Sequence, residues 1–181
     1  MKIIGLIGLG AMGGSYAKHL LDSGYEVFGV DPDTKNRSLF SSYGGIILND
    51  ISSLSGKCKV IILSLPTVPI FKDVINEFER NKSKFKTTLI IDMNTISLED
   101  KLEAKNKLKK LNIEFVDAPV SGTGAQAKSK DLVVMSSGSE DVIRDCEDIF
   151  NSFARKHIYV GDFGNGIKFK ILANLLVTVH N

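Results

Sequence analysis

Hydrophobic and polar positions alternate in blocks along the chain, and the block lengths predict strands and helices in turn. Short, mostly apolar runs of strand length occur at 2–7, 25–30, 45–48, 59–65, 87–92, 113–116, 132–136 and 157–160. Apolar residues recur at helical spacing at 11–21, 68–80, 97–110 and 139–153. Runs that are apolar throughout predict strands buried on both faces. Strands separated by helices predict an α/β fold, doubly wound around a mostly parallel sheet.

The first apolar run ends in a glycine-rich turn. Gly8, Gly10 and Gly13 follow that run directly, and the helical pattern at 11–21 begins inside the turn. At this Gly-x-Gly-x-x-Gly spacing, each glycine has a physical role in holding a dinucleotide. The first permits a tight turn, the second lets the backbone approach a pyrophosphate, and the third lets the helix pack closely on the strand. The turn therefore predicts a dinucleotide site, with a merely glycine-rich turn as the alternative.

An acidic residue at the end of the second strand supports the dinucleotide interpretation. Asp31 lies 18 residues past Gly13, where a carboxylate can accept hydrogen bonds from ribose hydroxyls. The N-terminus of the intervening helix offers unpaired N–H groups and the positive end of its dipole to phosphates. Asp31 also favours NAD over NADP, because a carboxylate repels a 2′-phosphate. Lys35 and Arg37 lie close enough in sequence to weaken that preference.

The end of the chain is an unusually apolar helix. Residues 166–181, GIKFKILANLLVTVHN, are apolar nearly all round, which is typical of a helix buried on most sides. No further element follows that could cover it, so we expect this chain to be the N-terminal part of a longer protein. Alone, the helix should pack against a second copy, fold back on the sheet or promote aggregation. The apolar stripe that it would expose comprises Leu172, Leu175, Leu176 and Val179.

Two segments carry candidate chemistry beyond the glycine turn. Residues 117–124, DAPVSGTG, present hydroxyls and backbone N–H groups that suit a carboxylate, although composition alone favours a plain turn of small residues. Lys170 and Asn174 lie four residues apart and therefore on one helical face. The apolar helix disfavours the ammonium form of Lys170, which suits proton transfer. A snorkelling lysine beside a structural asparagine is the alternative, and Lys168 is expected in solvent.

Composition narrows the function classes. The 181 residues, 43% hydrophobic and 24% charged, are enough for one full globular domain. A net charge of +2 argues against nucleic acid and anionic membrane surfaces as partners. No apolar run approaches the roughly 18 residues that span a bilayer, and the N-terminus lacks the form of a signal peptide. Cys58 and Cys146 have no CxxC partner, which predicts reduced thiols in a cytoplasmic protein.

The remaining polar residues suggest no other chemistry. The three histidines have no ligand spacing with Cys, Asp or Glu, so no metal site is predicted. Ser121 lacks the context of a nucleophile elbow, which leaves a Ser/His/Asp hydrolase unsupported. The lysine-rich stretch at 101–110 is interpreted as the solvated face of a helix.

Five motifs occur in the order and spacing of the β-hydroxyacid dehydrogenase family: GLIGLGAMG, LSLP, DMNTIS, DAPVSGTGAQA and GNGIKFKILAN. The chain resembles this family over its whole length. The family includes 3-hydroxyisobutyrate dehydrogenase, tartronate semialdehyde reductase and the glyoxylate/succinic semialdehyde reductases, and it is related to 6-phosphogluconate dehydrogenase. The resemblance implies a Rossmann NAD(P)-binding domain at 1–163. It also implies that 164–181 begins an interdomain helix leading to an all-helical domain, which this chain lacks, and that the full-length protein forms a homo-oligomer.

The resemblance also implies roles for individual residues. Lys170 would be the catalytic acid/base, supported by Asn174. The substrate carboxylate would be anchored by Ser121, Gly122 and Thr123. Cofactor-binding residues would be Gly8, Leu9, Gly10, Ala11, Met12, Gly13, Asp31, Leu65, Pro66 and Thr95, the last three on the nicotinamide side. Thr123 stands where the family usually has a second glycine, which leaves the substrate open, and Lys130 replaces another common glycine.

The predicted function is an NAD(P)-dependent oxidoreductase, with NAD the expected cofactor and NADP the second option. It would transfer a hydride between nicotinamide and a small β-hydroxyacid or carboxylate-bearing aldehyde. This chain alone should bind NAD but be inactive, since the absent domain would exclude water from Lys170. The alternative is a non-catalytic dinucleotide-binding module, for which an aligned lysine and asparagine would have no use. Imine reduction on the same scaffold usually lacks the lysine and is disfavoured.

Overall fold

The computed structural model describes residues 3–80 and 86–180, and its main sheet is parallel throughout. The six strands follow the order β3-β2-β1-β4-β5-β6, so the chain reverses direction across the sheet between β1 and β4. In doubly wound sheets, ligands bind beyond the carboxyl ends of the strands at such a point. The predicted α/β fold class is confirmed. The strands are β1 (Ile3–Ile7), β2 (Glu26–Val30), β3 (Ile46–Ile47), β4 (Val60–Leu63), β5 (Leu89–Asp92) and β6 (Glu114–Asp117).

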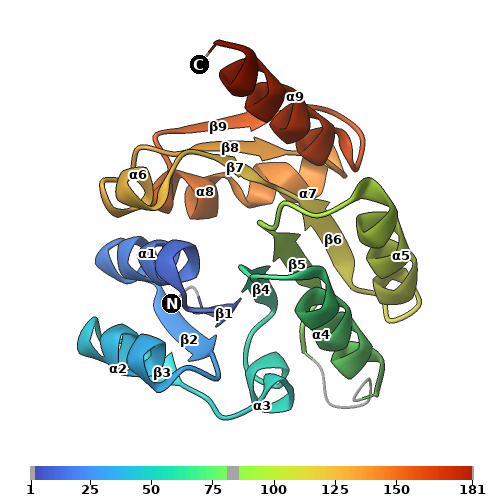
Figure 1. Ribbon diagram of the computed structural model, residues 1–181. Helices are drawn as coiled ribbons and strands as arrows, with labels where there is room; N and C mark the ends of the chain where they lie inside the picture. Colours follow the sequence, from blue (N-terminus) through green and yellow to red (C-terminus); the bar gives the residue numbers. More distant parts are fainter. Residues whose placement is uncertain (1–2, 81–85, 181) are drawn as a thin grey trace.

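Helices cover both faces of this sheet (Figure 1). Strand β4 shows the division, because Ile62 belongs to the core on one face and Ile61 and Leu63 to the core on the other. Tyr16 and Phe40, from the first two helices, belong to the same core as Ile62, so these helices cover that face. The first two helices are α1 (Ala11–Asp22) and α2 (Thr34–Ser42), and the opposite face is covered by α3 (Ile51–Ser55), α4 (Val68–Arg80) and α5 (Leu98–Lys109).

The last strands form a second sheet rather than extending the first. The runs predicted at 132–136 and 157–160 become β8 (Val133–Ser136) and β9 (Lys156–Tyr159). Strand β8 pairs antiparallel with β7 (Val120–Ser121), which the sequence did not predict, and parallel with β9. Pro119 cannot donate a ladder hydrogen bond, so the chain leaves β6 there and restarts in the new sheet. An isolated bridge between Asp117 and Ser137 links the two sheets.

The helix predicted at 139–153 is two helices, α7 (Glu140–Asp145) and α8 (Glu147–Phe153). Between them, the Cys146 N–H donates to the Ile143 carbonyl at 3.0 Å, a tighter turn than that of an α-helix. The break lets α8 turn its aromatic side chains toward α1, where the Phe153 ring lies 4.8 Å from the Tyr16 ring. A short helix that the sequence did not predict, α6 (Gly124–Lys128), precedes β8.

Helix α9 (Asn165–His180) runs across the second sheet (Figure 1). Only its first turn is deeply buried, where Ile167 is inaccessible to solvent. The apolar stripe expected on this helix is exposed at Leu172, Leu175 and Leu176, and the side chain of Val179 lies outside the described residues. The expectation that the helix is buried on most sides is therefore not met within this chain. In the ranges that the structure describes, no helix is long and apolar enough to cross a membrane.

Candidate active site

A cavity of about 580 Å³ opens beyond the carboxyl ends of β1, β2 and β4. Seven of the predicted cofactor residues line it, which are Gly8, Gly10, Ala11, Met12, Asp31, Leu65 and Pro66. The other three predicted cofactor residues lie outside this lining. Leu9 is buried behind the turn, Gly13 is buried in α1, and Thr95 is exposed after β5. The turn, the acid and the loop after β4 are thus brought to one place.

The three glycines of the turn differ in what surrounds them. A Cβ on Gly8 or Gly13 would lie 2.0 Å from a backbone oxygen, that of Ser64 or Gly8 respectively, and Gly8 also has a φ of +92°. A Cβ on Gly10 would meet no atom within 4 Å. Gly8 and Gly13 therefore let the backbone pack on itself, whereas Gly10 borders open space. This open space, beside the N-terminus of α1, fits the approach of a pyrophosphate.

Asp31 holds the glycine turn as well as lining the cavity. Its Oδ2 accepts a hydrogen bond of 2.6 Å from the Leu9 N–H, and its Oδ1 accepts one of 2.8 Å from the Asp33 N–H. The Asn36 amide lies 3.3 and 3.4 Å from the two oxygens. The carboxylate is buried, so these contacts fix its orientation at the edge of the cavity.

The loop after β4 is held by Asn94, which follows β5, and Asn94 is held in turn by Asp92 at the end of β5. The Leu65 N–H donates to Asn94 Oδ1 at 2.6 Å, and the Asn94 amide donates in turn to Asp92 Oδ1 at 2.6 Å. Asn94 and Asp92 are both buried, so this support is rigid. The family resemblance implies that Leu65 lies on the nicotinamide side of the cofactor, but no sequence pattern pointed to Asn94 as its support.

The loop at 117–124 combines an accessible turn with a helix cap. Ser121 is partly buried, and Gly122 is exposed with a φ of +139° that favours glycine. Thr123 is engaged with its own helix, since its hydroxyl accepts from the Gln126 N–H while its N–H donates to Gln126 Oε1 at 2.9 Å. Its side chain therefore caps α6 rather than pointing freely outward.

Lys170 and Asn174 lie on α9, outside the lining of the cavity. Lys170 is partly buried, and loss of solvent around its amine lowers its pKa from the usual value for lysine. Asn174 is exposed. Lys168 is exposed as predicted, and its amine contacts Asn165 Oδ1 at 3.3 Å.

A buried charge cluster lies between the cavity and α9. Lys101 is fully buried, which corrects the prediction that the stretch 101–110 is a solvated face. Its amine donates to Asp92 Oδ2 at 2.5 Å and to the Asn94 carbonyl at 2.8 Å, and it pairs with Asp117 Oδ1 at 2.8 Å. The other lysines of this stretch are exposed or partly buried. The sequence gives no sign of this, because the two carboxylates sit at the ends of separate strands.

Burial and charge oppose each other in this cluster. Burial raises the pKa of Asp92, and the Lys101 ammonium opposes that rise. Burial lowers the pKa of Lys101, but the carboxylates of Asp92 and Asp117 outweigh it and hold that pKa above the usual value for lysine. Lys101 therefore carries its positive charge inside the core.

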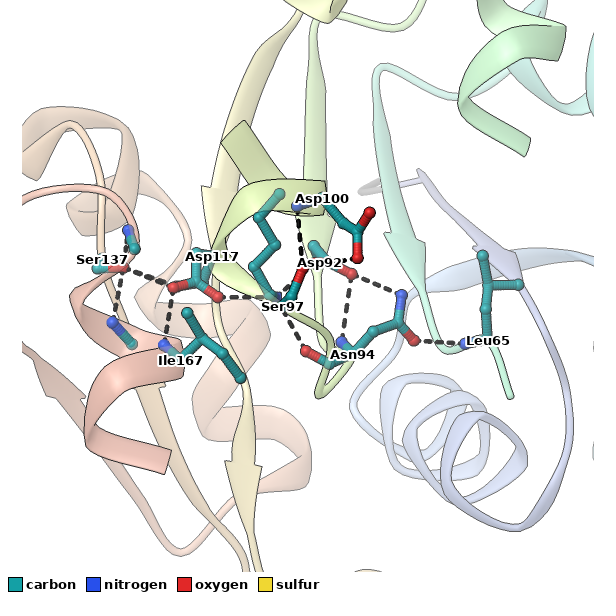
Figure 2. Close-up of polar contacts among 11 residues, drawn as sticks. Leu65, Asp92, Asn94, Ser97, Asp100, Asp117, Ser137 and Ile167 are labelled. Carbon is teal, nitrogen blue, oxygen red and sulfur yellow. Dashed lines mark hydrogen bonds and ion pairs between the residues drawn. The ribbon is translucent and has the colours of Figure 1, made fainter. Parts of the chain in front are cut away.

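Asp117 also holds the first turn of α9 (Figure 2). Its Oδ2 accepts from the Ile167 N–H at 2.9 Å and from the Ser137 hydroxyl at 3.0 Å. The Ser137 oxygen in turn accepts from the Gly164 and Gly166 N–H groups at 3.1 and 2.9 Å. The Gly166 and Ile167 N–H groups in the first turn of α9 are thus satisfied by Ser137, which directly follows β8, and by Asp117 at the end of β6.

The two histidines whose side chains the structure describes have structural partners. His19 Nε2 lies 3.0 Å from the Ala127 carbonyl, and His157 Nε2 lies 2.6 Å from the hydroxyl of buried Ser136. The side chain of His180 lies outside the described residues. Among the side chains that the structure describes, no three His, Cys, Asp or Glu residues gather as metal ligands would.

Comparison with known proteins identifies relatives of this chain. Residues 3–161 match the family model described as the NAD binding domain of 6-phosphogluconate dehydrogenase. The chain is 32% identical over 175 residues to 2-(hydroxymethyl)glutarate dehydrogenase of Eubacterium barkeri, covering 96% of this chain and 58% of the relative. It is 31% identical over 185 residues to human mitochondrial 3-hydroxyisobutyrate dehydrogenase, covering 97% and 53%. The chain thus spans little more than half the length of these relatives.

The fold also matches a solved structure. The 3-hydroxyisobutyrate dehydrogenase of Mycobacterium tuberculosis, solved with L-serine, superposes with a TM-score of 0.92 at 27% sequence identity. That match covers 99% of this chain and 61% of the other.

Proposed function

Since the chain belongs to the β-hydroxyacid dehydrogenase family, we propose that it is the NAD(P)-binding part of an oxidoreductase. The observation that carries this proposal is the open space above Gly10, in a cavity that Asp31 borders. Residues 1–163 would form the cofactor domain, and 164–181 would begin the helix that leads into a further helical domain. That domain, or a second copy, would cover Leu172, Leu175 and Leu176.

The reaction would move a hydride between nicotinamide and a small β-hydroxyacid or a carboxylate-bearing aldehyde. Bound nicotinamide supplies the hydride chemistry. Lys170 would take the substrate's hydroxyl proton on its amine during oxidation and return it during reduction. Its lowered pKa supports this role, because more of the amine is neutral near physiological pH than in an exposed lysine. Asn174, one turn along the same face, would orient the substrate oxygen.

The carboxylate of the substrate would be held by the loop after β7. We propose that the Ser121 hydroxyl and the backbone at Gly122 make the main contacts, since small residues let N–H groups approach an anion. Thr123, the third predicted anchor, would contribute mainly by fixing the turn, because both its hydroxyl and its N–H are engaged with Gln126.

A substrate panel tests the proposed activity. Small β-hydroxyacids with NAD, and semialdehydes with NADH, are mixed with the longest natural form of the protein while nicotinamide absorbance is followed. We expect turnover of at least one carboxylate-bearing member and none of its methyl ester, which lacks the charge that the loop would bind. Confirmed NADH binding with no turnover across the panel would instead favour a non-catalytic dinucleotide-binding module.

Cofactor preference is a separate prediction. We expect NADH to bind this chain at least about tenfold more tightly than NADPH, because the fixed carboxylate of Asp31 repels a 2′-phosphate. Arg37 contacts Asn49 Oδ1 at 3.1 Å, so its guanidinium is partly occupied. The chain has no tryptophan to report binding, so the titration follows the cofactor's own fluorescence. Equal or tighter binding of NADPH would contradict this prediction.

A further inference from the structure

The buried cluster around Lys101 has two arms that end at different parts of the proposed site. One arm runs from the Lys101 amine to Asp92, then through Asn94 to the Leu65 N–H. The other runs from the same amine to Asp117 and on to the Ile167 N–H. Figure 2 shows Leu65 at one end of these contacts and Ile167 with Ser137 at the other. A single side chain thus joins the loop after β4 to the start of α9.

The partners of both carboxylates are all hydrogen-bond donors or cations. Asp92 Oδ1 accepts from the Asn94 backbone and side-chain N–H groups, and its Oδ2 accepts from Lys101. Asp117 Oδ1 faces the ammonium, and its Oδ2 accepts from Ser137 and Ile167. One ammonium thus contacts both carboxylates, and Asp117 is also held at the N-terminus of α9.

Burying such a cluster in a core carries a large desolvation penalty. The loss of hydration often makes a buried ion cluster less stabilising than apolar side chains of the same volume. Its fixed geometry does, however, specify one arrangement of the groups that it joins. The neighbouring core of α5 is apolar, with Ala104 and Leu108 packed against the sheet. Packing alone therefore gives no reason for a charged residue at position 101.

We propose that Lys101 is a positioning residue that sets the loop carrying Leu65 and the helix carrying Lys170 relative to each other. The inference rests on the proposed function for the meaning of these two ends, but the linkage itself requires no cofactor. Without the ammonium, the carboxyl groups of Asp92 and Asp117 would lose the partner that joins them, and the strand ends that carry them would no longer be held together. Both arms would then loosen together, although the amine of Lys101 reaches Leu65 and Ile167 only through other side chains in these arms.

Amide hydrogen exchange in the ligand-free chain tests the linkage. In Lys101→Met we expect the Leu65 and Ile167 amides to exchange at least about tenfold faster, while the Ile62 and Ile91 amides change little. The matched control is Leu108→Ala, on the same helix, which should loosen the α5 core without singling out those two amides. Lys101→Arg keeps the charge and should restore much of the protection. Uniform acceleration in Lys101→Met, or loss at only one of the two ends, would overturn the proposal.

A milder variant keeps the test decisive if Lys101→Met does not fold. Ser137→Ala removes one cap of α9 and lies outside the lining of the cavity. If the linkage holds, this change should still weaken NADH binding by about threefold or more and speed exchange at Leu65. Unchanged binding and unchanged exchange at Leu65 would refute the linkage. Failure of the wild-type chain to bind NADH, with exchange still linked, would refute the proposed function and leave the linkage standing.

Discussion

Replacing Lys170 with methionine should lower kcat by about a thousandfold or more, because general acid–base catalysis contributes about 10² to 10⁴ to the rate of such reactions. The dissociation constant of NADH should stay within about twofold, since Lys170 lies outside the cavity that would hold the cofactor. The measurement is steady-state turnover in a catalytically active form of the protein, beside an NADH titration. The pH profile adds a sign. Desolvation lowers the pKa of Lys170, so oxidation should rise with pH through a value below that of an ordinary lysine.

Lys168 provides the matched control for this experiment. It lies two residues away on the same helix and is exposed, and its amine donates to Asn165 Oδ1 at 3.3 Å. Lys168→Met should keep turnover within about twofold, because surface side chains away from a site rarely matter. Near-normal turnover in Lys170→Met would remove this residue from the mechanism.

Two alanine substitutions in the glycine turn should affect different properties, one the binding of NADH and the other the stability of the fold. Gly10→Ala should weaken NADH binding by about fiftyfold or more, because its methyl group would fill the space that a pyrophosphate needs. Its melting temperature should stay within about 2 °C, since that methyl group meets no atom within 4 Å and the φ of −63° suits any residue. Gly13→Ala should instead destabilise the fold by several kcal/mol, since its Cβ would lie 2.0 Å from the Gly8 oxygen.

Thermal unfolding and NADH titration of both variants separate these effects. Gly24, which has a φ of +84° and open space around its Cβ position, ends α1 far from the cavity lining. Gly24→Ala therefore shows the backbone cost of a side chain at a positive φ, a cost that Gly10→Ala and Gly13→Ala do not incur. A Gly10→Ala variant that binds NADH normally would place the dinucleotide elsewhere.

The main sheet was predictable because its strands are continuous apolar runs flanked by turns and helices. The second sheet was not, because strand patterns carry no information on which sheet a strand joins. Strand β8 looks like any buried strand in sequence, and only the exit of the chain at Pro119 separates it from β6. Helices α2 and α3 are short, and their Asp33 and Asp50 caps are signals that a search for long periodic patterns does not detect.

The cofactor end of the site was predictable for a different reason. The glycine turn and Asp31 act through backbone shape and local spacing, which a sequence displays directly. Lys101 acts through Asp92 and Asp117, which are brought to it only when two strands and α5 are assembled. In sequence it is one lysine among several, and helical spacing placed it with the solvated ones. Ser137 was overlooked for the same reason, since its partners at Gly164 and Gly166 belong to another element.

The contacts of Asp31 constrain how this lineage can change its cofactor. Its carboxylate accepts from the Leu9 and Asp33 N–H groups, so it supports the turn whether or not a ribose is present. Replacing Asp31 with an apolar residue, to admit a phosphorylated ribose, would leave the buried Leu9 N–H without its acceptor. Substitution by asparagine would remove the charge and keep one acceptor oxygen for the Leu9 N–H, but the Asp33 N–H would then lose its acceptor.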